Sequence, residues 1–328
     1  MSLNGLENEK KEALNILLKI YFKTDDLGGI NKIRNIFEYE KYFDDYTNIK
    51  IHFFYPKIFD SEKEIKIERN RYEKNILKLL NYSNLPKLDL IKNPFIPPNF
   101  SLSYDGNDNL EINKNLIKLY KRIYPKLNVK TNYNRNKNKK IKIGFISEFF
   151  TNHTILKLFE GLIYNLNKTE FEIYVFYSDK TLPGSRYDQI KRNSILYNYE
   201  NIFLPEIFEE KVIEIKKHAL DILFYTDIHM SETLYFLTLL RLAKYQITSW
   251  GHPETTGNSE IDFFLSSELL ETENFNENYT EKVLLSKYLP MYFYKPIVIN
   301  KLSDDLLISK NIYTCPQNLI KMHPNFDI

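Results

Sequence analysis

The sequence contains little glycine and cysteine and no long apolar run. Its 328 residues include 9 glycines, 1 tryptophan and 1 cysteine, Cys315. A single cysteine cannot form a disulfide within the chain, and it argues against a metal site built from thiolates. No apolar run approaches the roughly 18 residues that span a bilayer, and the charged start MSLNGLENEKKEALN lacks the apolar core of a signal peptide. We therefore expect a soluble, cytoplasmic protein without a membrane partner.

Several motifs of common enzyme classes are also missing. The sequence around the end of the first strongly apolar run is GFISEFFTNH, where a dinucleotide-binding protein would have G-x-G-x-x-G. This disfavours a nicotinamide-dependent dehydrogenase. The chain has no Walker motif, no H-E-x-x-H and no G-x-S-x-G. Any chemistry must therefore be sought in other patterns.

Positive and negative charges are nearly balanced. The chain has 45 Lys and Arg residues against 43 Asp and Glu, a net charge of +2, so it has no general attraction to nucleic acid. We interpret the basic run NYNRNKNKK at 132–140 as a solvated linker. Hydrophobic residues make up 43% and charged residues 27% of the chain, a globular composition at a length that can hold two domains.

The first part of the chain, residues 1–93, is predicted to be a helical domain. Apolar residues recur at helical spacing over 7–22, which indicates an amphipathic helix. The pattern over 30–93 predicts two or more further helices, with an extended piece at IKIHFFYP, residues 49–56. We interpret the aromatic side chains here as core. Prolines, a turn signal, a further helix and the linker mark 94–139 as a boundary region.

From Lys140 onward, apolar runs alternate with helical patterns. The runs at 141–148, 171–179 and 221–227 have the composition of buried parallel strands. The alternation predicts βαβ units, and therefore an α/β, Rossmann-like domain with a mainly parallel sheet at 140–300. Such sheets bind ligands at the carboxyl ends of their strands.

The stretch YQITSWGHPETTGNSEIDFFLSSE, residues 245–268, is the most informative in the chain. We interpret it as two buried strands joined by a tight polar loop at the carboxyl edge of the sheet. Gly251 and Gly257 would let the backbone approach a ligand closely, and Pro253 would stiffen the loop. The pattern alone is also compatible with an ordinary connection between elements.

The loop resembles the GHPxTTG-type loop of bacterial O-GlcNAc-transferase-like proteins, the glycosyltransferase family 41 that includes SPINDLY- and HMW1C-like members. The stretches FSLSYDGNDN, SEFFTNHT, DILFYTDIHMS, LRLAKYQ and CPQNLIKMHP resemble further elements of this family. These stretches depart from its usual pattern in four places: Glu148 replaces an aspartate, Ile228 a glycine, Met230-Ser231 a threonine and Lys244 a proline. The resemblance covers roughly residues 95–328.

The resemblance implies a GT-B fold, in which two Rossmann-like domains face each other across the active site. Residues 140–300 would be the N-terminal half, preceded by the α-helical domain, and 301–328 would begin a truncated C-terminal half. The implied reaction is inverting transfer of a sugar from UDP-GlcNAc, or another UDP-sugar, to a Ser or Thr hydroxyl of an acceptor protein or peptide. Because the second half supplies most of the family's nucleotide pocket, the chain alone is expected to have little activity.

The resemblance also assigns roles to residues. His153 and Lys321 would be catalytic, His153 beside the sugar and acceptor and Lys321 at the diphosphate, whose charge a lysine ammonium can neutralise. The substrate-binding residues would be Asp227, His229, Arg241, His252, Pro253, Thr255, Thr256 and Gly257. No cofactor, metal or nucleic-acid partner is expected, and the general base is not assigned.

Two alternatives stay open. The sequence of the GHPETTG loop also resembles that of HMW1C-like N-glucosyltransferases, which transfer glucose from UDP-glucose to asparagine. From a different class, the chain could be a non-catalytic remnant or fragment that binds a protein through its aromatic-rich helical domain.

Overall fold

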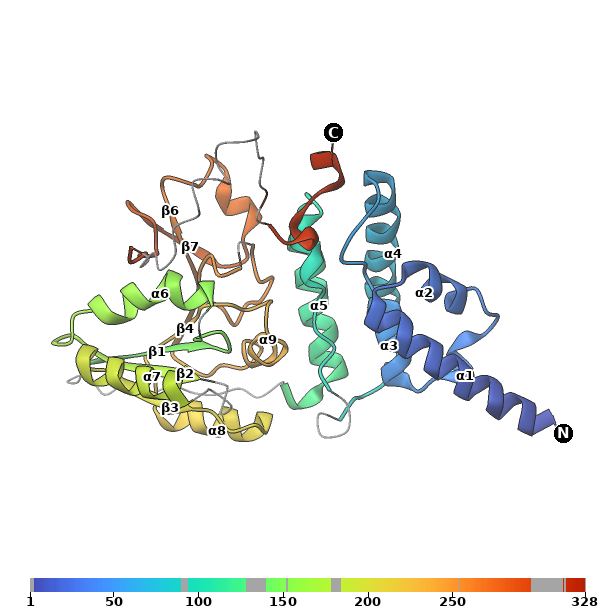
Figure 1. Cartoon of the computed structure of the whole chain (residues 1–328), viewed down its shortest axis with the longest axis horizontal. Coiled ribbons are helices and arrows are strands. Elements are labelled where there is room, and N and C mark those ends of the chain that lie inside the picture. The colour runs from blue at the N-terminus through green and yellow to red at the C-terminus, as the bar shows by residue number, and fades with distance from the viewer. Residues whose placement is uncertain are drawn as a thin grey trace, which may run out of the picture.

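The computed structural model describes residues 3–89, 94–127, 140–151, 153–177, 184–252, 254–295, 315 and 317–327. A helical part and an α/β part lie side by side, and α5 is the helix of the helical part that lies nearest the α/β part (Figure 1). Within the described residues, no helix is long and apolar enough to cross a membrane.

The helical part confirms the amphipathic helix predicted at 7–22. Its helices are α1 (Leu3–Thr24), α2 (Leu27–Arg34), α3 (Asp45–Phe53), α4 (Glu62–Asn81) and α5 (Leu110–Ile123). Helix α1 ends where Asp25 adopts a left-handed conformation with φ 57°. The Asp26 carboxylate then accepts the N–H of Gly29 at 2.8 Å and starts α2.

The extended conformation predicted for 49–56 is wrong over its first five residues, which belong to α3. The Asp44 carboxylate accepts the N–H of Thr47 at 2.7 Å and caps this helix. Ile49 and Phe53, one helical turn apart, both enter the main hydrophobic core. β-Branched and aromatic residues favour a strand locally, but the cap and the core contacts stabilise a helix here.

The α/β part contains a sheet of seven strands in the order β3-β2-β1-β4-β5-β6-β7. All the pairings are parallel, which confirms the predicted fold class. The strands are β1 (Ile141–Ser147), β2 (Phe171–Tyr177), β3 (Glu200–Phe203), β4 (Ile222–Tyr225), β5 (Tyr245–Thr248), β6 (Phe263–Ser267) and β7 (Lys282–Ser286). The two edge strands, β3 and β7, were not predicted from the sequence.

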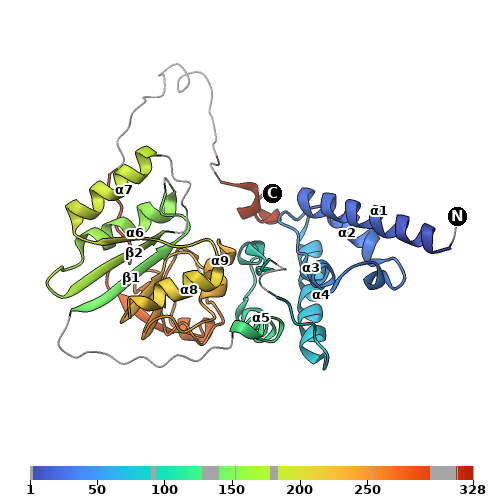
Figure 2. The same ribbon diagram turned by 90° about the horizontal axis from the view of Figure 1, so that it is seen from below.

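Helices cover both faces of the sheet. They are α6 (Thr154–Asn165), α7 (Gly184–Tyr197), α8 (Phe208–Lys217) and α9 (Glu232–Leu237). Figure 2 shows α6 and α7 on one side of β1 and β2 and α8 on the other. Successive strand residues alternate between the faces: Val175 packs with α6 and α7, whereas Phe176 packs in the core that includes α8 and α9.

Helix α5 joins the two parts through one continuous core. Tyr120 of α5 makes an edge-to-face contact with Phe236 of α9 at a centroid distance of 5.0 Å. Phe95, from the segment before α5, stacks on the same Phe236 ring at 3.9 Å. The core therefore runs across the predicted domain limits at 93 and 139, and these limits remain a prediction.

The segment 317–327 returns to the helical part. Its 3₁₀ turn η5 (Leu319–Lys321) lies against the 3₁₀ turn η2 (Phe100–Tyr104), near the upper end of α5 in Figure 1. Lys321 of this turn is also close enough to His153, which follows β1, to influence its pKa, so the turn lies near the carboxyl edge of the sheet.

Candidate functional site

The candidate site lies where the strand order of the sheet reverses. The chain proceeds from β1 outward to β2 and β3 on one side, then from β4 to β7 on the other. The crevice at such a reversal, outside the carboxyl ends of the strands, is where open α/β sheets bind ligands. His153 follows β1, Asp227 and His229 follow β4, and His252 follows β5. The structure thus brings four predicted site residues to one edge.

His153 is the N-cap residue of α6. Its Nδ1 accepts the N–H of Ile155 at 3.2 Å, and its ring lies 4.8 Å from that of Phe149. Burial, then the positive charges of Lys321 and Lys157, lower the pKa of His153. The ring is therefore neutral at pH 7, and because Nδ1 accepts a bond, its proton sits on Nε2. His153 can donate a hydrogen bond through Nε2 at the N-terminus of a helix.

Lys321 lies close enough to His153 for its charge to lower the pKa of the imidazole. Its ammonium lies over the ring of Tyr104, 5.6 Å from the centroid, and the side chain is exposed. An exposed ammonium beside a helix N-terminus is a suitable environment for an anion.

Asp227 is completely buried directly after β4. Its Oδ1 accepts the hydroxyl of Thr226 at 2.7 Å. Burial raises the pKa of Asp227 to about 8, although hydrogen bonds from Ser147 and Thr226 act in the opposite direction. The adjoining Ser231, which caps α9, donates to Glu148 after β1 and so ties the two strand ends together.

His229 and His252 form a buried pair with Glu254. The ring centroids of the two histidines lie 4.2 Å apart, and Nε2 of His252 lies 3.2 Å from Oε1 of Glu254. Burial, followed by the charge of His252, lowers the pKa of His229 to about 3, so this ring is neutral. Burial alone would raise the pKa of Glu254, but the hydrogen bond and charge of His252 keep it below its ordinary value.

Residues around α5 hold this group in place. The Ser103 hydroxyl lies 2.8 Å from Nε2 of His252. The Asn109 amide donates to Oε2 of Glu254 at 2.8 Å, and the Asn113 amide donates to the carbonyl of Thr255 at 3.0 Å. The loop after β5 is therefore fixed by the helical part as well as by the sheet.

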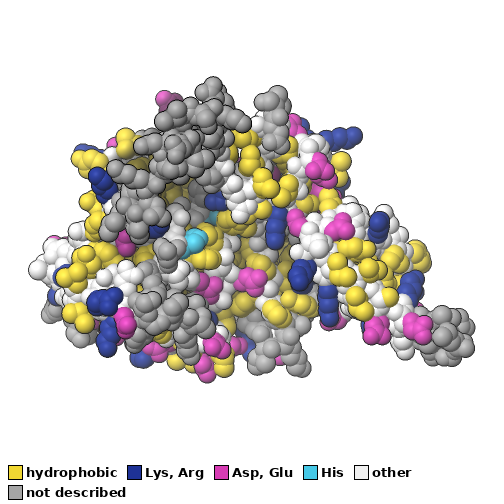
Figure 3. All heavy atoms as spheres, viewed as in Figure 1, with side chains coloured by type: hydrophobic (Ala, Val, Ile, Leu, Met, Phe, Trp, Pro, Cys, Tyr) yellow, Lys and Arg dark blue, Asp and Glu magenta, His cyan; other side chains and the backbone are white. Residues whose placement is uncertain are grey.

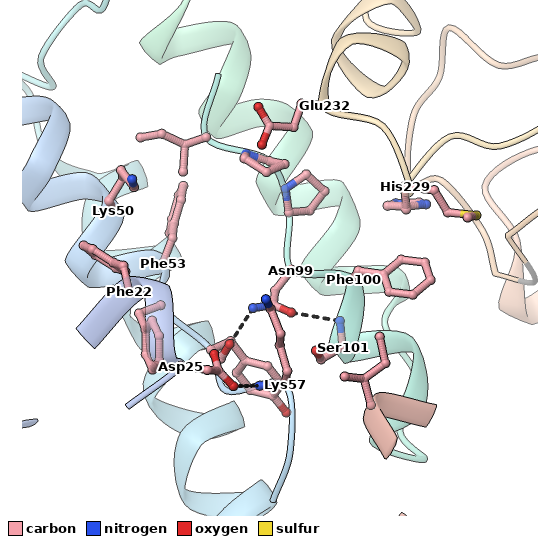
Figure 4. A pocket seen from close by; sticks show the side chains of 17 residues that line it. Phe22, Asp25, Lys50, Phe53, Lys57, Asn99, Phe100, Ser101, His229 and Glu232 are labelled. Atoms are coloured by element: carbon pink, nitrogen blue, oxygen red, sulfur yellow. Dashed lines mark hydrogen bonds between the residues drawn. The ribbon is translucent and has the colours of Figure 1, made fainter. Parts of the chain in front are cut away.

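A pocket of about 480 Å³ opens beside the pair, between the helical part and the carboxyl edge of the sheet. In Figure 4, His229 and Phe100 lie on one side of it, and Phe22, Phe53 and Lys50 line the other. Pro97, Pro98 and Asn99 also line the pocket. On the face drawn in Figure 3, histidine shows on the surface of the α/β part.

Several predicted site residues have structural partners instead. Arg241 forms ion pairs with Glu260 at 3.2 Å and Asp262 at 2.6 Å, at the amino edge of β5 and β6. The structure therefore places Arg241 away from the other site residues. Pro253 lies outside the described residues.

The Thr255-Thr256-Gly257 corner is also occupied by internal contacts. The Thr255 hydroxyl donates to Glu281 at 2.6 Å, and both the N–H and the hydroxyl of Thr256 donate to the same carboxylate. Gly257 has φ +67°, and a Cβ there would lie 2.6 Å from the backbone of Asn113. The glycine is needed because the loop approaches α5, so the expected close approach to a ligand is not what requires it.

Sequence reasoning missed Glu254, Ser103 and Asn109 as parts of the site. Glu254 lies inside the GHPETTG loop, and Ser103 and Asn109 lie inside FSLSYDGNDN, so both stretches had been singled out. Nothing in their spacing indicates that they meet, because 145 residues separate Asn109 from Glu254.

Comparison with known proteins gives a fold and no family. No family model matches the chain, and no curated protein matches it. Among solved structures, a mutant of the Thermobaculum terrenum O-GlcNAc transferase is similar, with a TM-score of 0.53 and 15% sequence identity. The match covers 86% of this chain and 51% of that one. The chain is thus a GT-B-type Rossmann-like domain preceded by an α-helical domain, and it spans about half of that neighbour.

Proposed function

We propose that this chain belongs to an inverting, UDP-sugar-dependent glycosyltransferase that modifies protein hydroxyl groups. The observation that carries the proposal is the gathering of His153, Asp227, His229 and His252 at the carboxyl edge of the sheet, with Lys321 beside them. A fold similar to that of an O-GlcNAc transferase supports it.

The chemistry follows from the groups at the edge. An acceptor oxygen would attack C1 of the sugar, the bond from C1 to the UDP oxygen would break, and the acceptor proton would pass to a base. Negative charge develops on the departing diphosphate, where the exposed Lys321 ammonium and the N-terminus of α6 would stabilise it. His153, neutral with its proton on Nε2, would donate a hydrogen bond to the sugar nucleotide rather than accept the acceptor proton.

The pocket between the two parts is suited to an acceptor peptide. Its aromatic and proline residues offer apolar contacts, while Lys50, Asp25 and Glu232 offer charges among its lining residues. His229 belongs to the pocket lining, so a peptide bound there would reach the carboxyl edge of the sheet.

The proposal is tested by sugar transfer from UDP-GlcNAc and from UDP-glucose, assayed with this chain and with the full product of its gene. We expect transfer of GlcNAc to Ser or Thr of a protein acceptor by the full product, and little transfer by the chain alone, which spans half of its structural neighbour. Transfer of glucose to asparagine would favour the N-glucosyltransferase alternative. Absence of transfer and of UDP binding in both proteins would contradict the proposal and favour a protein-binding role.

A further inference from the structure

We propose that His229, His252 and Glu254 bind one transition-metal ion of the zinc class. The three residues come from the ends of two different strands, β4 and β5, and a ligating atom of each lies within 4.8 Å of those of the other two. Two histidines and one glutamate are a donor set that Zn²⁺ uses in proteins, with a further position left for water or another ligand.

The spacing of the closest pair matches such a site. Nε2 of His252 and Oε1 of Glu254 are 3.2 Å apart. Two ligands at about 2.0–2.2 Å from a tetrahedral metal ion lie roughly 3.3–3.5 Å from each other. A small movement of His229 toward this pair would complete a set of three.

Three of the four ring nitrogens of the two histidines have no hydrogen-bond partner among the described residues. Neither Nδ1 nor Nε2 of His229 has a hydrogen-bond partner among the described residues, and Nδ1 of His252 has none there either. The side chains are buried, with 8% and 3% of the residue surface exposed for His229 and His252. Buried polar atoms are rarely left unpaired, and each one calls for a specific explanation.

Glu254 supplies the charge that a cation would balance. In the part of the chain that the structure describes, its one ion-pair partner is His252, at 3.2 Å, and no lysine or arginine forms an ion pair with it. The side chain of Glu254 is 17% exposed. A carboxylate so largely removed from water is costly without an opposite charge, and a divalent ion at this position would provide it.

Surrounding residues orient the ligands. Asn109 donates to Glu254, and Ser103 lies at hydrogen-bond distance from His252. Outer partners of this kind hold metal ligands in place and contribute to affinity. The 3.2 Å spacing from Glu254 applies to Nε2 of His252, which would be the ligand if the Ser103 hydroxyl turns away; if Ser103 keeps its contact with Nε2, the unpaired Nδ1 would be the ligand. His229 lines the pocket, so the remaining coordination position would face it.

The experiment is titration of Zn²⁺ alone into the chelator-treated 328-residue chain, with competition by a coloured chelator. We expect one ion per chain and, with Co²⁺, the intense visible absorption of a tetrahedral site. His229→Gln and Glu254→Gln should each weaken Zn²⁺ binding by at least about tenfold, because the loss of an outer partner alone already weakens metal binding by about that much. Circular dichroism shows whether the variants are folded. Two different ligands are substituted, so that if one variant does not fold, the other still tests the site.

The matched control is His218→Gln. His218 forms the other histidine–glutamate pair of the described chain, with Nε2 at 3.3 Å from Glu214 on α8. This variant should bind Zn²⁺ as the unmodified chain does. Binding of less than one ion per chain, or equal losses in the three variants, would show adventitious metal only and overturn the proposal. The metal is titrated alone, so the result is independent of sugar transfer, although that proposal also uses His229 and His252.

Discussion

The imidazole rings of His229 and His252 lie 4.2 Å apart, although they follow two different strands. The contact exists because β4 and β5 are parallel neighbours, so their carboxyl ends meet at one edge. Asn109 and Ser103 approach the same group from the helical part. The site therefore depends on how the two parts pack, and its residues can be tested separately for roles in structure and in binding.

His153 should serve both as a helix cap and as a hydrogen-bond donor, and two substitutions separate the roles. His153→Ala removes both and should lower the free energy of unfolding by about 1 kcal/mol. His153→Asn keeps a side chain that caps α6, so stability should change by less than about 0.5 kcal/mol. Loss of the Nε2 donor should reduce sugar transfer by about 100-fold in both variants of the full gene product. Full activity in His153→Asn would leave only the capping role.

The charge of Lys321 should be detectable at His153. Burial, Lys321 and Lys157, in that order, lower the pKa of His153. Replacing Lys321 with alanine removes one positive charge and should therefore raise the pKa of the imidazole, measured by NMR titration of its ring protons. Lys157→Ala should raise it by less. An unchanged titration in Lys321→Ala would mean that the two residues are not neighbours in solution, and the proposed diphosphate site would lose its cation.

The Lys321 variant also tests nucleotide binding. If the ammonium contacts the diphosphate, Lys321→Ala should weaken UDP binding by the full gene product, and the loss should shrink as salt is added. Calorimetric titration at two salt concentrations measures both effects. Lys140→Ala, which removes a lysine at the start of β1 on the opposite edge of the sheet, is the control and should leave UDP affinity unchanged.

Gly257 should be required for folding rather than for ligand contact. Its φ of +67° is unfavourable for other residues, and a Cβ would lie 2.6 Å from the Asn113 backbone. Gly257→Ala should therefore lower the free energy of unfolding by about 2 kcal/mol or more, measured by urea denaturation. Gly28→Ala is the control. A Cβ at Gly28, inside α2, has only the side chain of Asp26 nearby, at 3.3 Å, so its effect should stay within about 1 kcal/mol.

The fold was largely predictable from hydrophobic patterning. Apolar runs identified β1, β2 and β4, and the 245–268 stretch identified β5 and β6. The edge strand β3, at Glu200–Phe203, has only four residues, and one of them, Ile202, is buried, so it lacks a recognisable run. Helix α3 was missed because its sequence favours a strand, while a cap and the core stabilise a helix.

The site was predictable only in part. Position at a strand end is encoded locally, but His153, His229 and His252 were named because their motifs resemble those of a known family. The hydrogen-bond and ion-pair partners of a side chain are not encoded in the neighbouring sequence. Thr256 donates to Glu281, and Glu254 accepts from Asn109, because of contacts between elements far apart in the chain. Arg241 shows the same effect, since its partner Asp262 also accepts the N–H of Gln246 at 2.7 Å and so fixes the start of β5.

The pH dependence of stability provides the last prediction, through His52 of α3. Burial, then the charge of Lys78, lowers the pKa of His52 to about 4 in the folded chain, against about 6.5 when unfolded. Between these values the unfolded chain binds more protons, so stability should be complete above pH 6.5 and fall as the pH drops toward 4. The loss should total about 3 kcal/mol. His52→Gln cannot titrate, so urea denaturation over this pH range should show a smaller decline in the variant. Parallel declines in the two proteins would show that His52 is not held neutral in the folded state.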